Sequence, residues 1–232
     1  MIKALTPFTF AASLLWAQSS GAAIVYLAGD TVDFYYDDAQ PGMAVYGSLS
    51  VVGDAIFATP DQFLAESYGG VSNTSALGTV TVVAKPGYAF SAINVAIEGD
   101  YRLTGAGASV GVAGNLTIED SANPATTEAL VMSNSGLGIN DGLTHLWSAS
   151  GSFDLSTAQW NGVNSIELSL ETILNASAGS GEYAFIQNKF AGGGMVTIET
   201  AVIPVPAALW LMATGLLALV GVARKKSFDS HG

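Results

Sequence analysis

A histidine in a β-like segment is the first candidate for acid–base chemistry. His145 lies in the segment THLWSAS, and the chain's second histidine, His231, is the next-to-last residue. A serine hydrolase would also need a G-x-S-x-G turn to present its nucleophile, and residues 133–136 do not have that frame. The sequence therefore disfavours a serine hydrolase, and a partly exposed strand residue is the simpler interpretation of His145.

Carboxylates are the most abundant reactive groups. They occur close together at Asp37–Asp38, at Glu98 and Asp100, and at Glu119–Asp120. Glycoside hydrolysis needs two carboxyl groups about 5–10 Å apart across a cleft. Adjacent residues on a strand point to opposite faces, so sequence neighbours do not by themselves form such a pair. We expect these acids to be solvated turn residues, with Glu98 and Asp100 at one turn, and assign no catalytic residue.

Two kinds of binding chemistry remain open. Loop acids with backbone carbonyls can give calcium six to eight oxygen ligands, and Asp37, Asp38 and Asp141 are the candidates. The D-x-[DN]-x-[DN]-G calcium loop is absent from the sequence, so no cofactor is otherwise predicted. Aromatic rings can stack on sugars, but in an all-β domain they more often belong to the core or rim. The aromatic candidates are Tyr35, Tyr36, Trp147 and Trp160.

The composition excludes several classes of function. The 232 residues include no cysteine, which rules out disulfides, zinc–thiolate sites and a thiol nucleophile. Between residues 24 and 203 the basic residues are Lys85, Arg102 and Lys189, against 18 acidic residues, which gives a net charge of −15. Such a surface repels phosphate backbones, so we expect no nucleic-acid partner. It is compatible with divalent cations and neutral sugars.

The elements that must position these residues have the pattern of β-strands. In NSIELSLETIL, residues 164–174, Ile166, Leu168 and Leu170 alternate with Glu167 and Ser169. That period of two is typical of a half-buried antiparallel strand. The same rule predicts strands over residues 24–27, 31–36, 44–52, 77–84, 92–98, 108–118, 145–155, 183–190 and 195–201.

About ten strands with glycine-rich turns between them predict an all-β fold, an antiparallel β-sandwich or jelly roll over residues 24–200. For residues 59–67, TPDQFLAES, a single helical turn, an edge strand and a loop remain open. Residues 123–127, NPATT, are expected to form a loop. The sequence shows no composition break within 24–200, so one domain is predicted.

The N-terminal residues 1–23 have the features of a secretory signal peptide. A lysine at position 3 precedes the uncharged run ALTPFTFAASLLWA, which is followed by the small residues of QSSGAA. This order of charge, apolar run and small residues is the pattern that signal peptidase cleaves. We predict cleavage after Ala22 or Ala23, with export through the Sec translocon.

The C-terminal residues 201–232 have the features of a single membrane span. Residues 207–223 carry no charge, and 17 helical residues measure about 26 Å, at the short end for a bilayer core. The basic residues Arg224, Lys225 and Lys226 place that end in the cytoplasm. The sequence thus predicts an exported body held in the inner membrane by one C-terminal transmembrane helix.

A proline motif, Pro204-Val205-Pro206-Ala207-Ala208, begins just before the apolar span. Together with the span and the basic end, this motif resembles the PEP-CTERM sorting signal. The resemblance lies in the proline motif, the apolar span with Trp210, and the basic end. The basic family form has Pro-Glu-Pro, and Val205 stands where glutamate is common, similar to the variant that reads V-P-V-P-A-A. The residues that match the motif are Pro204, Val205, Pro206, Ala207, Ala208, Arg224, Lys225 and Lys226. Residues 35–63 and 85–103 also resemble a recurring type of body found in this family.

The resemblance implies recognition by an exosortase in the inner membrane of a Gram-negative bacterium. The tail would be cut near the proline motif, and the body would pass to the cell surface or extracellular matrix, in association with exopolysaccharide or biofilm. The family supplies no activity to carry over. We therefore expect a non-enzymatic matrix protein, with a carbohydrate-binding adhesin as the alternative and a carbohydrate-active hydrolase as the third.

Overall fold

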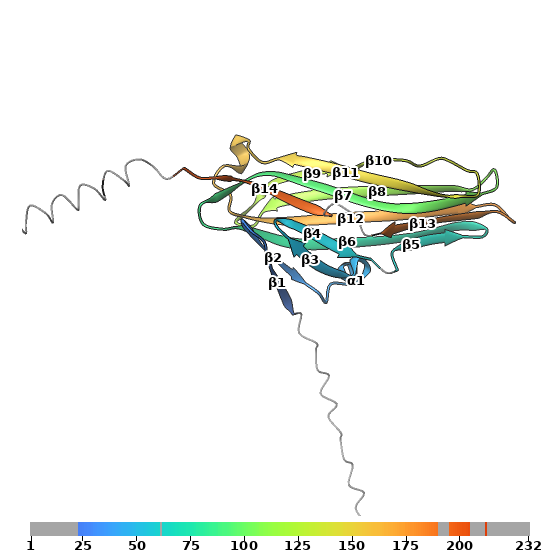
Figure 1. Cartoon of the computed structure of the whole chain (residues 1–232), viewed down its shortest axis with the longest axis horizontal. Coiled ribbons are helices and arrows are strands. Elements are labelled where there is room, and N and C mark those ends of the chain that lie inside the picture. The colour runs from blue at the N-terminus through green and yellow to red at the C-terminus, as the bar shows by residue number, and fades with distance from the viewer. Residues whose placement is uncertain (1–22, 61, 190–194, 205–211, 213–232) are drawn as a thin grey trace, which may run out of the picture.

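The computed structural model describes residues 23–60, 62–189, 195–204 and 212. Across these residues the protein is all-β and has two antiparallel sheets, whose longer strands run along the long axis of the molecule (Figure 1). The first sheet has six strands, in the order β1 (Ile24–Ala28), β2 (Val32–Asp37), β6 (Gly70–Ala84), β12 (Ser165–Ala178), β8 (Ser109–Asp120) and β9 (Asn123–Val131).

The second sheet has eight strands. Six follow the order β10 (Ser133–Ser135), β11 (Thr144–Asp154), β7 (Tyr88–Thr104), β14 (Val196–Val202), β4 (Ala55–Thr59) and β3 (Ser48–Val52). The remaining two are β13 (Tyr183–Lys189), which pairs with β7, and β5 (Leu64–Ser67), which pairs with β13. The long strand β7 therefore pairs with β14 along its first half and with β13 along its second half.

The core follows from the alternation that the sequence shows. In β12, Ile166, Leu168 and Leu170 are buried, whereas Glu167 is exposed and Ser169 is half-buried, as predicted. Val80 and Val82 of β6 are buried in the same way. Burial of each such side chain contributes about 1.5–3 kcal/mol, so the period-two pattern fixes which face of each strand points inward.

A short helix replaces the first part of one predicted strand. The expectation of a strand over 44–52 was wrong for its first residues, because α1 (Pro41–Tyr46) occupies them and β3 begins at Ser48. Pro41 lies in the first turn, where its missing N–H costs nothing. Met43 and Tyr46 are buried at a spacing of three, which is helical. Gly47, with φ of 73°, ends the helix.

The expected loop at residues 123–127 is also wrong, because these residues begin β9. This strand pairs with β8 and lies at the edge of the six-stranded sheet. Pro124 is compatible with that place, since one side of an edge strand needs no N–H donor. For residues 59–67 the sequence left a helical turn, an edge strand and a loop as alternatives. In the structure Thr59 ends β4 and Leu64–Ser67 form β5.

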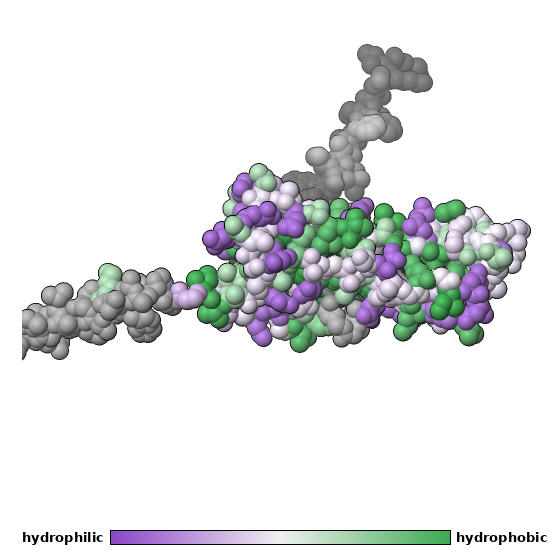
Figure 2. Space-filling view, turned by 90° about the horizontal axis from the view of Figure 1, so that it is seen from above, coloured by the Kyte–Doolittle hydropathy of each residue, from purple (hydrophilic) through white to green (hydrophobic). Residues whose placement is uncertain are grey.

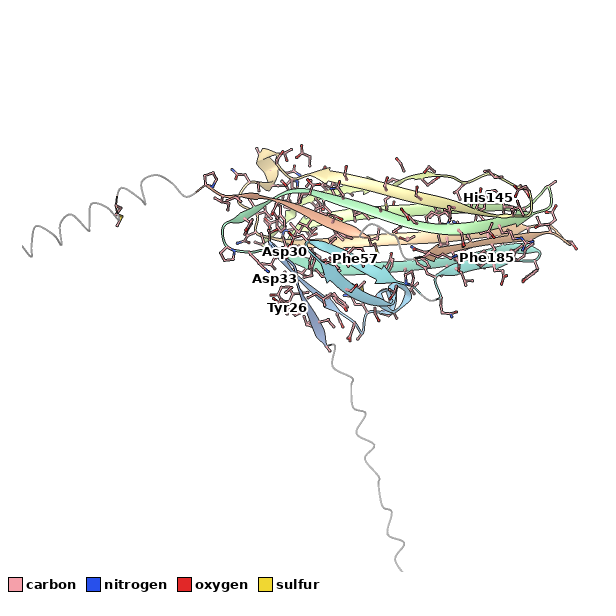
Figure 3. The ribbon with its side chains drawn as sticks, viewed as in Figure 1. Tyr26, Asp30, Asp33, Phe57, His145 and Phe185 are labelled. Carbon is pink, nitrogen blue, oxygen red and sulfur yellow. The ribbon has the colours of Figure 1, made fainter. Side chains whose placement is uncertain are left out.

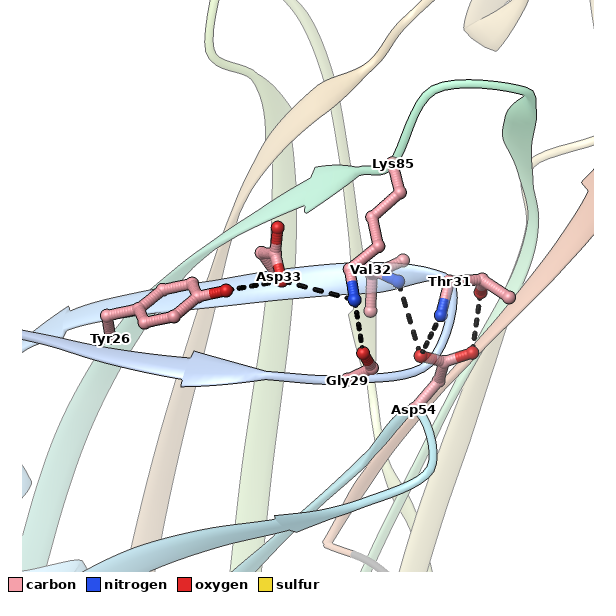
Figure 4. Close-up of polar contacts among 7 residues, drawn as sticks. All are labelled: Tyr26, Gly29, Thr31, Val32, Asp33, Asp54 and Lys85. Carbon is pink, nitrogen blue, oxygen red and sulfur yellow. Dashed lines mark hydrogen bonds and ion pairs between the residues drawn. The ribbon is translucent and has the colours of Figure 1, made fainter.

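One carboxylate joins the two sheets at the end where the chain leaves β14. Asp54, in the turn between β3 and β4, accepts hydrogen bonds from Thr31 N at 2.8 Å, Thr31 Oγ1 at 2.5 Å and Val32 N at 3.2 Å (Figure 4). The Thr31 hydroxyl also lies 2.8 Å from the hydroxyl of Thr200 in β14. Thr31 belongs to the β1–β2 turn, so this group ties the six-stranded sheet to the eight-stranded one.

A lysine strengthens the same turn. Lys85 Nζ lies 3.5 Å from Asp33 Oδ1 and donates a hydrogen bond to the carbonyl of Gly29 (Figure 4). The hydroxyl of Tyr26 donates to Asp33 Oδ1 at 3.0 Å. The first hairpin is therefore held to the body by side-chain contacts in addition to its pairing with β6.

Candidate functional site: the outer face of the eight-stranded sheet

The side chains of β7 and β11 that point away from the core line a shallow groove, in which polar groups alternate with small and apolar residues such as Leu146. Ser148, Ser150 and Ser152 of β11 stand opposite Glu98, Ala96 and Asn94 of β7 in the antiparallel register. Two hollows of about 360 and 400 Å³ adjoin along these strands, and Glu98 lines both. Hydroxyl, amide and carboxylate groups in a long open groove suit hydrogen bonding to a polar polymer better than enclosure of a small molecule.

The charged residues that line this groove are Glu98 of β7 and Lys189 of β13. Asp100 is 6% exposed, forms an ion pair with Lys189 and accepts a hydrogen bond from Gln187 Nε2 at 2.7 Å. Glu98 is exposed and stands opposite Lys189 in the register. The expected turn at these acids was wrong, because both lie within β7. Glu98 and Asp100 point to the same face of the sheet, with their backbones about 7 Å apart. Both carboxylate oxygens of Asp100, however, already have hydrogen-bond partners.

An aromatic group lies on the same face at the start of β13. The rings of Tyr68 and Tyr183 have centroids 5.1 Å apart and are tilted by 44°. Their hydroxyls donate to Glu66 Oε1, at 3.0 Å from Tyr68 and 2.8 Å from Tyr183. Burial, followed by the bond to Glu66, raises the pKa of Tyr183 to about 12. For Tyr68 the bond to Glu66 is the main cause of a raised pKa.

Sequence reasoning did not predict this tyrosine group. Each tyrosine lies next to a glycine-rich turn, Tyr68 before Gly69–Gly70 and Tyr183 shortly after Gly181. Aromatic residues at turns are a signal for exposure, but the pairing of residues so far apart in sequence depends on the β5–β13 register.

The aromatic residues that the sequence analysis favoured are placed differently. Trp147 is 2% and Trp160 is 3% exposed. Their indole N–H groups donate to Gln187 O at 3.1 Å and to Glu128 Oε2 at 3.2 Å. Both tryptophans therefore pack in the core. Tyr35 and Tyr36 are half-buried in β2, and the ring of Tyr35 lies 5.3 Å from that of Tyr26.

The calcium candidates do not converge. Asp37 Oδ1 accepts from Ala39 N at 2.9 Å, and Asp38 is exposed beside it. Asp141 Oδ1 instead lies 2.7 Å from His145 Nε2 and accepts from Leu143 N at 2.9 Å. Among the described residues there is no group of three or more His, Cys, Asp or Glu side chains that could hold a metal ion.

His145 is a partly exposed strand residue with structural contacts. Besides its contact with Asp141, its ring lies 5.7 Å from that of Tyr101. The bond to His145 is the first cause of a lowered pKa at Asp141. The Tyr101 hydroxyl donates to Gly136 O at 3.0 Å and accepts from Ile139 N at 2.9 Å. This arrangement fastens the loop between β10 and β11 to the sheet.

The predicted processing sites lie at the two ends of the strand-forming region. Ala23 is exposed directly before β1, and Pro204 is exposed two residues after β14. Outside the described residues lie Ala22, Val205, Pro206, Ala207, Ala208, Arg224, Lys225 and Lys226. Within the part of the chain that the structure describes, no helix is long and apolar enough to cross a membrane.

Comparisons with known proteins give little more. No protein-family model and no curated protein matches the chain. Among solved structures, the enzymatically active domain of tailspike protein 4 of bacteriophage CBA120 matches with 9% identity and a TM-score of 0.24. The match covers 74% of this chain and 20% of that one, so this chain spans about a fifth of its length. At this TM-score the similarity defines neither fold nor activity.

Proposed function

We propose that the chain is an exported, non-enzymatic matrix protein, sorted by an exosortase through its C-terminal signal. Its body is a β-sandwich that associates with extracellular polysaccharide. The observation that carries this proposal is the coincidence of the strand-forming region with the predicted cuts. β1 begins at Ile24 and β14 ends at Val202. Cleavage after Ala22 or Ala23 and again within residues 204–208 would keep every strand that the structure describes.

The chemistry of the outer face supports a binding role. The groove along β7 and β11 is long and open, and serine hydroxyls lie among its apolar lining residues. The two carboxylates of β7 on this face, Glu98 and Asp100, are an unsuitable acid–base pair, because Asp100 is held by Lys189 and Gln187. In the space-filling view, hydrophilic and hydrophobic residues are intermixed over the face seen from above (Figure 2). Such a surface is compatible with a protein that contacts a hydrated matrix.

The proposal is tested by following the protein in the native bacterium with and without its exosortase. We expect the full chain to accumulate in the inner membrane when the enzyme is deleted, and the body to reach the cell surface or medium when it is present. A control chain that stops after Ile203 should be exported in both strains. Equal release of the full-length protein in both strains would contradict the sorting proposal.

A further inference from the structure

We define the tyrosine platform as Tyr68, Tyr183 and Glu66, of which Tyr68 is exposed and the other two are half-buried. Tyr68 is 70% exposed to solvent, although its ring contacts the ring of Tyr183. A tyrosine that only covered the end of a hairpin would bury its ring and leave its hydroxyl to water. Here the hydroxyl is bonded to Glu66 and the ring is presented to solvent.

The platform is held in place before any ligand arrives. Tyr68 follows β5 and Tyr183 begins β13, and both hydroxyls reach the same oxygen of Glu66. Rings that are already oriented lose little conformational entropy when they bind, which is why tyrosine is a favoured contact residue in binding sites. The two rings thus form a fixed apolar surface with a carboxylate at its margin.

Polar groups beside the platform can bond to a ligand. In the register, Glu66 stands opposite Phe185, and Phe185 stands opposite Arg102, so all three share the outer face. Strands lie about 4.8 Å apart, which puts the Glu66 and Arg102 backbones about 10 Å apart. Both tyrosines bond to Oε1 of Glu66, and within the described residues Oε2 accepts no hydrogen bond. One acceptor and one guanidinium donor therefore flank an apolar surface.

The platform lies far from the exit of the C-terminal tail. Val202 pairs with Tyr88 at one end of β7, and Tyr183 pairs with Thr104 at the other. Sixteen residues of strand separate these ends, a distance of about 50 Å. Figure 3 shows Phe185 at the end of the molecule away from that exit. A body held by its tail would present the platform away from the attachment point.

The charge of the body limits the ligand. With a net charge of −15 between residues 24 and 203, the body repels acidic polymers over a Debye length of about 8 Å at physiological salt. A sugar ring has an apolar face for stacking and hydroxyls that both donate and accept, which matches tyrosine rings flanked by Glu66 and Arg102. We propose that the tyrosine platform binds one sugar unit of a neutral polysaccharide. This inference rests on the proposed function, and it names the residues and the class of sugar through which the body would contact the polysaccharide.

Affinity electrophoresis tests the inference on the purified full chain in mild detergent. Native gels would contain hydroxyethylcellulose, dextran or galactomannan as neutral probes and alginate as an acidic one. We expect at least one neutral polymer to retard the protein, and Tyr68→Ala to weaken that retardation about tenfold. The matched control is Tyr26→Ala, which removes another exposed tyrosine that bonds to a carboxylate and contacts a second tyrosine.

Folding of each variant is checked by urea unfolding, and Tyr68→Phe serves as a second variant that keeps the ring. It should bind more strongly than Tyr68→Ala, because it keeps the stacking ring, and more weakly than wild type, because it loses the bond to Glu66 that orients the ring. The inference is overturned by retardation in alginate alone, by no retardation in any neutral polymer, or by equal effects of Tyr68→Ala and Tyr26→Ala. The assay involves no exosortase, so its failure would leave the sorting result unaffected.

Discussion

Removal of the Asp54 carboxylate should loosen the contact between the two sheets. Three hydrogen bonds end on this group, and they join the β1–β2 turn to the β3–β4 turn. Hydrogen bonds to a charged group contribute about 1.5–3 kcal/mol each when buried, and solvent screening at this partly exposed site reduces that value. We therefore expect Asp54→Ala to lower the free energy of unfolding by about 2–3 kcal/mol in total.

The effect should depend on pH with a defined sign. Partial burial raises the pKa of Asp54, but the bonds from Thr31, Val32 and Asp30 outweigh it, so the net pKa lies below its ordinary value. A lowered folded-state pKa gives stability that is present above the unfolded pKa of about 3.9 and is lost as pH falls through the folded value. The difference in the free energy of unfolding between wild type and Asp54→Ala should therefore become smaller below about pH 4.

Urea unfolding at pH 7 and pH 3, followed by the fluorescence of the buried tryptophans, measures both effects. The control is Asp154→Ala, because Asp154 accepts two hydrogen bonds from Ser156 within its own turn. It should lose much less stability than Asp54→Ala. If Asp54→Ala does not fold, Asp54→Asn retains one carbonyl oxygen and should show part of the loss. Equal losses for the two alanine variants, or a difference independent of pH, would refute the reasoning.

Two further changes probe the interior. Gly99→Ala would place a Cβ 1.9 Å from Gln187 O, so we expect it to lower the free energy of unfolding by more than about 3 kcal/mol. The control Gly111→Ala has open space around its Cβ and should leave the stability unchanged. Equal thermal midpoints for the two variants would contradict this prediction. Tyr46→Phe should cost about 1 kcal/mol through loss of the bond to Thr172. Burial raises the pKa of Tyr46 to about 12, so wild type should lose more stability than Tyr46→Phe as the pH rises from about 10 to 12. The loss that remains in Tyr46→Phe would come from Tyr183, whose pKa is also raised to about 12.

The strands that sequence predicted best are those with one fully buried face. β12 alternates cleanly because every second residue from Ile166 to Ala178 packs in the core. α1 was missed because six residues are too few for a helical period to stand out, although Pro41 and the Met43–Tyr46 spacing are local signals. β9 was missed because an exposed edge strand shows no alternation of burial.

The candidate site was less predictable than the fold. Glycine at position 99 suggested a turn, but Gly99 lies within β7. The residue is glycine because the backbone of Gln187 and the indole of Trp147 leave no room for a side chain. The platform depends on the register that brings Glu66 opposite Phe185. Composition gives no information on register, which is fixed by pairing between distant segments. The tryptophans were candidates because indole rings suit both core and binding surface.

The most direct test of the account is the mass of the mature protein recovered from the surface or medium of the native bacterium. Peptide mapping of both termini should give a chain that begins at Ala23 or Ile24 and ends within residues 204–208. All strands from β1 to β14 would then be present. Recovery of the extracellular protein with Arg224, Lys225 and Lys226 still attached would contradict the account.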